Sequence, residues 1–144
     1  MALPDEIERI LDDDLLYHRV HEDFIDPERP DVVVPDAIKP EGDGLSMDWA
    51  KKCTPEETRQ RAKTRSVSEY GVIGILASNI RSNTDLKIEY RPTPENPAHV
   101  LVNAAWQIEN KSQESKRTRR KLRTILARYA IWMIFPGRIA SENP

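Results

Sequence analysis

The chain has 144 residues, of which 32% are charged and 38% hydrophobic, and its formal net charge is −2. A chain of this length buries roughly 70% of the surface that its unfolded form exposes, which suffices for one hydrophobic core. The apolar content lies above that of disordered proteins. We therefore expect residues 1–144 to form a single folded domain.

The sequence favours a cytoplasmic protein and predicts no membrane contact. The longest apolar stretch, Ile131–Phe135, is far shorter than the ~20 residues that cross a bilayer. The first ten residues carry acids where a secretion signal carries lysine and arginine. Cys53 is the only cysteine, which excludes an internal disulfide and favours a reducing compartment.

Charge is distributed unevenly along the chain. Residues 1–50 hold fifteen acidic and four basic residues, whereas residues 111–128 hold eight basic and one acidic residue. Opposite charges of this size attract. The two segments are therefore expected either to face each other, within the fold or in a dimer, or to meet different partners.

The first fifty residues contain few signals for regular structure. Pro4 followed by two acids suits a first helical turn, and a short helix to about Leu11 is expected. LLYHRV, residues 15–20, predicts a strand. Residues 21–44 hold four prolines and read as a loop-rich segment in which VVV, residues 32–34, forms a short edge strand.

A capping box gives the clearest local signal. Thr54 and Glu57 can each accept from the other's backbone N–H, and Pro55 suits the first helical position, so a helix over residues 55–63 is predicted. Cys53 precedes this helix. The helix dipole would lower the pKa of its thiol, whereas burial would leave the thiol inert, and the second outcome is favoured.

The second half of the chain predicts strands followed by one long helix. GVIGILA, LKIEYR and HVLVNAAWQI read as strands, with a turn or a single helical turn at SNIRSN. Apolar residues then recur at spacings of three and four from residue 113 to residue 135. These elements predict an α+β fold: a mostly antiparallel sheet of about four strands, covered by a long C-terminal amphipathic helix.

Two groups of histidines are candidates for chemistry. His18 and His21 are three residues apart on a predicted strand, where they would point to opposite faces, so no metal site is expected. RPTPENPAHVLV, residues 91–102, stiffens the link between two strands with three prolines. One interpretation is a purely structural, rigid connection. The alternative is a ligand-binding cluster of Glu95, Asn96 and His99.

The C-terminal helix carries a cationic face. We expect this face to be solvated or paired with acids, and nucleic acid or a protein partner are the alternatives. Tyr129 and Trp132 could stack on bases, but they fall on the apolar stripe and are assigned to the core. The basic face consists of Arg117, Arg120, Lys121, Arg123 and Arg128.

One set of residues resembles ADP-ribosyltransferases. Arg19, Ser46 and Gln107-Ile-Glu109 follow the order in which an arginine, a serine and a Q-x-E triplet occur in that family. The resemblance implies that Glu109 orients a ribose hydroxyl. The chain lacks the family's serine-threonine-serine strand, and a proline-rich segment replaces the expected helix.

A second resemblance covers residues 45–102. LSMDW, TPEETR and ENPAH, in this order, are similar to Ser-Val-Asp/Asn-Trp, T-P-E-E-T-R and E-N-x-A-H of a group of small bacterial proteins. The resemblance implies no activity. It does imply that six residues form a connected feature: Trp49, Thr54, Glu57, Arg59, Asn96 and His99.

Three functions remain open. The first is a protein-binding or adaptor domain of a multi-component bacterial system, without cofactor or catalysis, which recognises a protein partner or a second copy through Trp49, Arg59, Glu95, Asn96 and His99. The second is an RNA-binding protein or metal-free nuclease with His99 as acid-base and Arg59 or Arg91 holding phosphate. The third is an ADP-ribosyltransferase-like enzyme.

Overall fold

The computed structural model describes residues 9–40, 44–62, 66–83, 86–104 and 113–136. These residues form three helices: α1 (Pro55–Gln60), α2 (Ala77–Arg81) and α3 (Gln113–Tyr129). Short 3-10 turns lie at Glu22–Phe24 (η2), Pro35–Ala37 (η3) and Val67–Glu69 (η4). The strands are β1 (Leu15–His21), β2 (Leu45–Trp49), β3 (Tyr70–Leu76), β4 (Leu86–Tyr90), β5 (His99–Ala104) and β6 (Ile131–Ile134).

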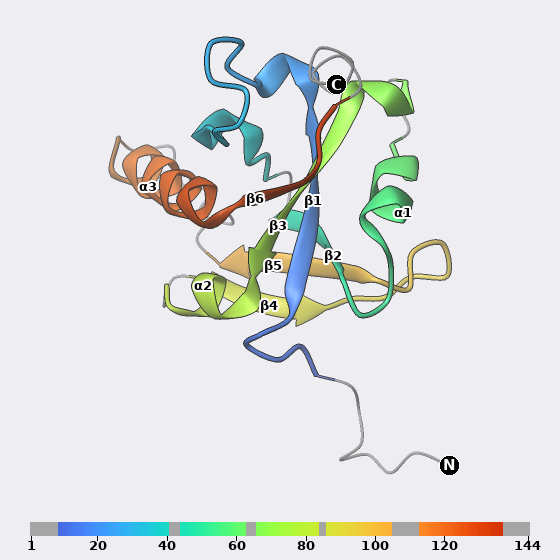
Figure 1. Cartoon of the computed structure of the whole chain (residues 1–144). Helices are drawn as coiled ribbons and strands as arrows, with labels where there is room; N and C mark the ends of the chain where they lie inside the picture. The colour runs from blue at the N-terminus through green and yellow to red at the C-terminus, as the bar shows by residue number, and fades with distance from the viewer. Residues whose placement is uncertain (1–8, 41–43, 63–65, 84–85, 105–112, 137–144) are drawn as a thin grey trace, which may run out of the picture.

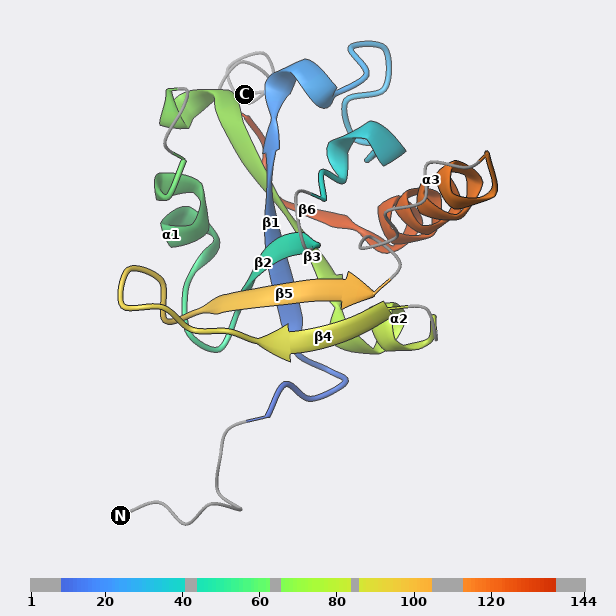
Figure 2. The same ribbon diagram turned by 180° about the vertical axis from the view of Figure 1, so that it is seen from behind.

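The six strands form one antiparallel sheet in the order β4-β5-β2-β1-β3-β6 (Figure 1). The predicted α+β class is confirmed, but the predicted sheet of about four strands is wrong because β2 and β6 were not foreseen. The sheet twists strongly, so that β4 and β5 run crosswise to β1 and β3 (Figures 1 and 2).

β2, which lies shortly before the capping box in the sequence, was not predicted. Leu45, Met47 and Trp49 are buried and alternate with Ser46, which is exposed, as a strand with one packed face requires. Asp48 breaks the alternation because it is buried as well, by partners far away in the sequence. The remaining period-two pattern is the signal that could have predicted this strand.

The C-terminal helix ends six residues before its predicted end. α3 stops at Tyr129, and Ile131–Ile134 pairs with β3 instead. Gly71 permits this close approach, since a Cβ there would lie 2.5 Å from the carbonyl oxygen of Ile134. The helical spacing of Trp132 and Met133 was therefore misleading. Residues 131–134 are also compatible with a strand, and they pair with the edge of β3.

Two other local predictions are wrong. Arg9–Leu11 is not helical, because Asp14 draws the chain into a turn by accepting from the Leu11 N–H at 2.7 Å. Residues 32–34 form no strand, since Val33 is buried in the core and Val34 begins the 3-10 turn at Pro35. The remainder of the helix predicted near Pro4 lies outside the described residues.

The main core lies on one face of the sheet and is closed by α3 and η3. Leu16, Trp49, Ile75 and Val100 project from the strands and pack with Leu122 and Leu126 of α3 in a single cluster. α1 lies on the other side of β1 (Figure 2). No helix in the described part of the chain is long and apolar enough to span a membrane.

Candidate functional site

A large hollow opens where β1 and β2 separate. These strands pair only at Leu16 with Trp49 and at Tyr17 with Asp48, after which the twist carries them apart. The hollow has a volume of about 1010 Å³ and is lined by β1, β2, α1, the connection from β4 to β5 and the first residue of β5. We call this cavity the inter-strand hollow.

Asp48 is the hub of the inter-strand hollow. Its side chain is 6% exposed, and its Oδ2 accepts from Thr58 Oγ1 at 2.8 Å and from Arg61 Nη1 at 2.7 Å. Its Oδ1 accepts from Asn96 Nδ2 at 2.8 Å. A buried carboxylate is tolerated only with such partners, so this residue holds β2, α1 and the β4–β5 connection together.

The β4–β5 connection is held rigidly by its own hydrogen bonds. Asn96 Oδ1 accepts from the Ala98 N–H at 3.1 Å, and Tyr90 Oη donates to the Pro97 carbonyl at 2.7 Å. The connection therefore has a defined shape up to His99, where β5 begins. His99 begins β5, as predicted, and the connection that precedes it also lines the hollow.

His99 is oriented toward Ser46. Its Nδ1 donates to the Arg91 carbonyl at 3.0 Å, which places the proton on Nδ1 and leaves Nε2 as an acceptor. Ser46 Oγ lies 3.5 Å from this Nε2. In its neutral form, a histidine fixed in this way can accept a proton from a hydroxyl group brought to its Nε2.

Cations and rings line other parts of the hollow. Arg19 projects from β1 and donates to the Thr58 carbonyl at 3.1 Å, and Arg61 reaches in from α1. Lys39 lies 3.8 Å above the Phe24 ring centroid. At one end of the hollow, the Tyr70 ring lies edge-on to the His21 ring. The hollow thus holds cations and aromatic rings beside the carboxylates of Asp48 and Glu95.

His18 and His21 have partners of their own. His18 Nδ1 donates to the Ser46 carbonyl at 3.0 Å and its Nε2 accepts from the Lys39 N–H at 3.4 Å, while burial lowers its pKa. His21 Nε2 donates to Glu69 at 3.1 Å. Within the described ranges, no three histidines, cysteines or carboxylates are grouped as metal ligands.

Cys53 is a packed thiol. Its side chain is buried, and its Sγ donates to the Trp49 carbonyl at 3.6 Å. Burial raises the pKa of Cys53 above its ordinary value, although hydrogen bonds from Thr58 and Arg61 act in the opposite direction. The activation by the helix dipole that its position allowed is therefore overruled by desolvation.

The structure divides the predicted recognition cluster. Glu95, Asn96 and His99 line the hollow, but Trp49 is fully buried on the opposite face of the sheet, edge-on to the Tyr90 ring. Arg59 lies outside the hollow and pairs with Glu56. His99 and Trp49 therefore share no cleft, and a surface that uses both is excluded.

The residues proposed for the other functions are described only in part. Arg19 and Ser46 both line the hollow, while Gln107 and Glu109 lie outside the described residues. Arg91, one of the two predicted phosphate ligands, pairs with Glu89. The hub residues Asp48, Thr58 and Arg61 were missed because only the tertiary structure brings α1 against β2.

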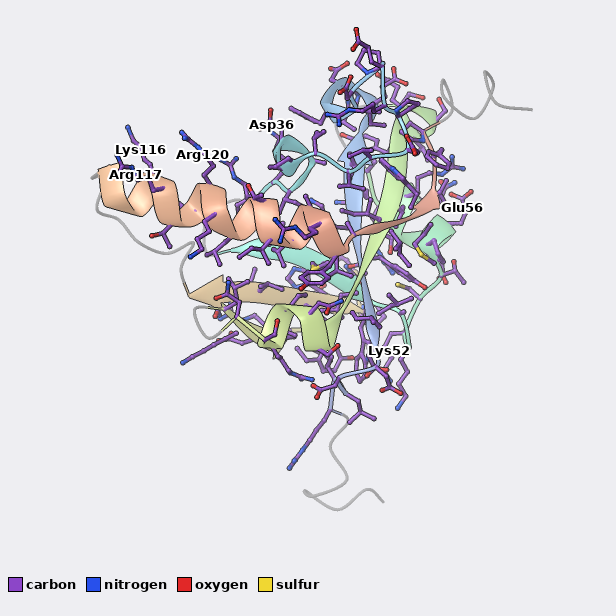
Figure 3. The ribbon with its side chains drawn as sticks, turned by 60° about the vertical axis from the view of Figure 1, so that its left-hand side comes forward. Asp36, Lys52, Glu56, Lys116, Arg117 and Arg120 are labelled. Carbon is purple, nitrogen blue, oxygen red and sulfur yellow. The ribbon has the colours of Figure 1, made fainter. Side chains whose placement is uncertain are left out.

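The predicted basic face lies apart from the hollow. Lys116, Arg117 and Arg120 extend from α3, far from Glu56 on α1 (Figure 3). Arg117, Arg120, Lys121, Arg123 and Arg128 form no ion pair with any residue in the described part of the chain. Tyr129, assigned to the core from its spacing, is 44% exposed.

Comparisons with known proteins find no matching family model, curated protein or solved structure.

Proposed function

We propose that the inter-strand hollow binds a nicotinamide dinucleotide and that the chain is an ADP-ribosyltransferase-like enzyme. The observation that carries the proposal is the meeting of Arg19, Ser46 and His99, from three different strands, in one hollow. Two of these residues are those that resemble the family's arginine and serine. His99 Nε2 lies 3.5 Å from the Ser46 hydroxyl and is a group that can exchange a proton there.

The lining of the hollow suits such a ligand. Its volume, about 1010 Å³, is at the upper end of small-molecule sites. Arg19 supplies charge for a pyrophosphate, since a guanidinium group can donate two hydrogen bonds to phosphate oxygens. Tyr70 and Phe24 offer flat faces for the base or the nicotinamide. Ser46 and His99 can bind ribose hydroxyls.

The reaction is a substitution at the nicotinamide ribose. The C–N bond to nicotinamide breaks, and nicotinamide leaves with the bonding electrons. A nucleophile of the acceptor forms a bond to the same ribose carbon and loses a proton, which His99 Nε2 accepts. Arg19 stabilises the diphosphate that remains attached to the ribose. No oxidant or reductant is required.

The proposal is tested by NAD binding in calorimetry and by release of nicotinamide. We expect Arg19→Ala to weaken binding at least tenfold and Ser46→Ala and His99→Gln to slow nicotinamide release by roughly 100-fold, within the range for general acid-base groups. Arg29→Ala is the matched control, because Arg29 is 68% exposed and outside the hollow. Arg19→Lys separates lost charge from lost geometry.

Two results would refute the proposal. A folded wild-type protein that neither binds NAD nor releases nicotinamide would refute the proposal. Binding that is unchanged in Arg19→Ala, Ser46→Ala and His99→Gln would place the dinucleotide elsewhere and would also refute it.

A second candidate is protein recognition, the function predicted first from the sequence. β6 is the outer strand on its side of the described sheet, and Ile131 is 53% exposed. An apolar edge strand pairs readily with another strand, and two copies can pair around a two-fold axis. We propose a second copy of this chain as the partner.

Sedimentation velocity tests this candidate. The wild type is expected to dimerise with rising concentration and Ile131→Lys to stay monomeric. Leu11→Lys is the control, since Leu11 is 59% exposed and lies outside the strands of the sheet. A monomeric wild type throughout the concentration range would rule out the dimer.

A further inference from the structure

α3 presents a continuous row of cations to solvent. Arg117, Lys121 and Arg128 are exposed and lie within about 40° of one another around the helix axis. Residues 116–128 contain no carboxylate that could neutralise them. The row extends along most of the helix, so it offers several positive charges in line.

The described acids of the first fifty residues form no ion pair with this row, although Asp36 lies on η3, which packs against α3. In the described part of the chain, Asp12 pairs with Arg81, Asp26 with Arg29, and Asp48 with Arg61. None of them reaches α3. The internal pairing of the two charged segments, one of the outcomes considered from the sequence, is therefore absent among these residues, and the row is open to an external anion.

A groove runs beside the row, between α2 and α3. Its volume is about 300 Å³, and its lining includes Ser82 of the α2 end together with Lys121, Ile125 and Tyr129 of α3. The Tyr129 ring is half exposed at this groove, next to the cations. The sequence had placed this ring on the far side from the basic residues.

The combination of a cationic row with an adjacent exposed ring favours one class of ligand. Phosphates of a nucleic-acid strand are attracted by lysine and arginine, and unpaired bases stack on aromatic side chains. An acidic protein segment without aromatic residues would use the cations but would leave Tyr129 without a stacking partner. A duplex would keep its bases stacked internally and out of reach of the ring.

We propose that the groove between α2 and α3 binds single-stranded nucleic acid, with phosphates on Arg117, Lys121 and Arg128 and one base stacked on Tyr129. This site is separate from the inter-strand hollow and does not depend on the function proposed for it. Recognition is by backbone charge and stacking, so little sequence preference is expected.

Fluorescence polarisation with labelled twelve-nucleotide thymidine and uridine oligonucleotides tests the proposal. With three phosphate contacts, the logarithm of the affinity should fall with the logarithm of salt with a slope of about −2, since each contact on a single strand contributes about −0.7. Arg117→Gln, Lys121→Gln and Arg128→Gln should each weaken binding and make the slope less steep by about 0.7.

Tyr129 separates stacking from charge. Tyr129→Ala should weaken binding about tenfold or more without changing the salt slope, and Tyr129→Phe should retain it. Arg29→Gln is the matched control for loss of an exposed cation and should leave binding unchanged. Arg19→Ala should also leave it unchanged, so failure of the hollow and failure of the groove are distinguishable.

Three outcomes would overturn the proposal. The first is no binding to either oligonucleotide at 50 mM salt. The second is binding that polyglutamate displaces as well as the oligonucleotide does and that Tyr129→Ala leaves unchanged, which would indicate an acidic protein segment. The third is tighter binding to a duplex of equal length. Circular dichroism confirms that each variant is folded.

Discussion

Asp48 and Asn96, 48 residues apart in the sequence, are joined by a hydrogen bond of 2.8 Å from Asn96 Nδ2 to Asp48 Oδ1. The bond connects β2 to the link that precedes His99. Because Thr58 and Arg61 bind the other carboxylate oxygen, three separate segments depend on one buried charge. The shape of the inter-strand hollow follows from this arrangement.

Asp48→Asn is expected to lower the free energy of unfolding by about 2–4 kcal/mol. An asparagine brings an N–H group of its own, so it must face at least one of the three donors that Asp48 accepts. Urea denaturation measures the change. Asp36→Asn, at an exposed position of η3, is the control and should change stability by less than about 0.5 kcal/mol. Equal effects of the two substitutions would contradict the hub.

Thr54→Ala is expected to cost about 1 kcal/mol of stability. Thr54 Oγ1 accepts from the Glu57 N–H at 3.1 Å, and Glu57 Oε1 accepts from the Thr54 N–H at 3.0 Å. The predicted capping box is thus confirmed, and it holds the helix that delivers Thr58 to the hollow. Thr54→Ser keeps the hydroxyl and should be nearly neutral in thermal unfolding. A similar loss for both variants would assign the effect to packing instead.

Acid should destabilise the protein through His18. Burial lowers the folded-state pKa of this ring below its ordinary value of 6.5, so below about pH 6.5 the unfolded state binds a proton that the folded state does not. Its stabilising contribution is complete above that pH and is lost as pH falls toward the folded pKa. The loss amounts to at most about 1.4 kcal/mol per pH unit.

His18→Gln tests this origin of the acid sensitivity, because an amide can replace both hydrogen bonds without titrating. Urea denaturation between pH 7.5 and pH 5 should show a steeper loss for the wild type than for the variant. Parallel curves would mean that other groups account for the acid response.

Cys53 is expected to be unreactive in the folded protein. Its thiol is buried and its pKa is raised by desolvation, so little thiolate is available at pH 8. Ellman's reagent should label it only after urea is added. A Ser68→Cys variant provides an exposed thiol in the same chain, which should react within minutes. Equally rapid labelling of the wild type would show that the thiol is accessible.

Gly71→Ala should destabilise the protein by about 1–3 kcal/mol, because the added Cβ would lie 2.5 Å from the backbone oxygen of Ile134. Gly74→Ala is the matched comparison. Its Cβ would meet the flexible Met133 side chain at 3.2 Å, which can move aside. In thermal unfolding, the melting temperature of Gly71→Ala should lie well below that of Gly74→Ala. The reverse order would argue against the close approach of β6 to β3.

The accuracy of the sequence predictions followed the range of the interactions involved. The capping box at Thr54 and the strands at LLYHRV, GVIGILA and LKIEYR depend on neighbouring residues, and they were predicted correctly. β6 was taken for helix because Trp132 and Met133 satisfy a helical spacing as well as a strand. Only the free edge of β3 decided between the two.

The site followed the same rule. The sequence by itself determined that residues 91–99 are stiff and that α3 is amphipathic and cationic, because proline torsions and charge order are local properties. The tertiary structure alone decided that Trp49 lies across the sheet from His99, that Asp48 is buried among distant donors and that Tyr129 is exposed. These facts depend on strand pairing and twist, which no segment encodes without its partners.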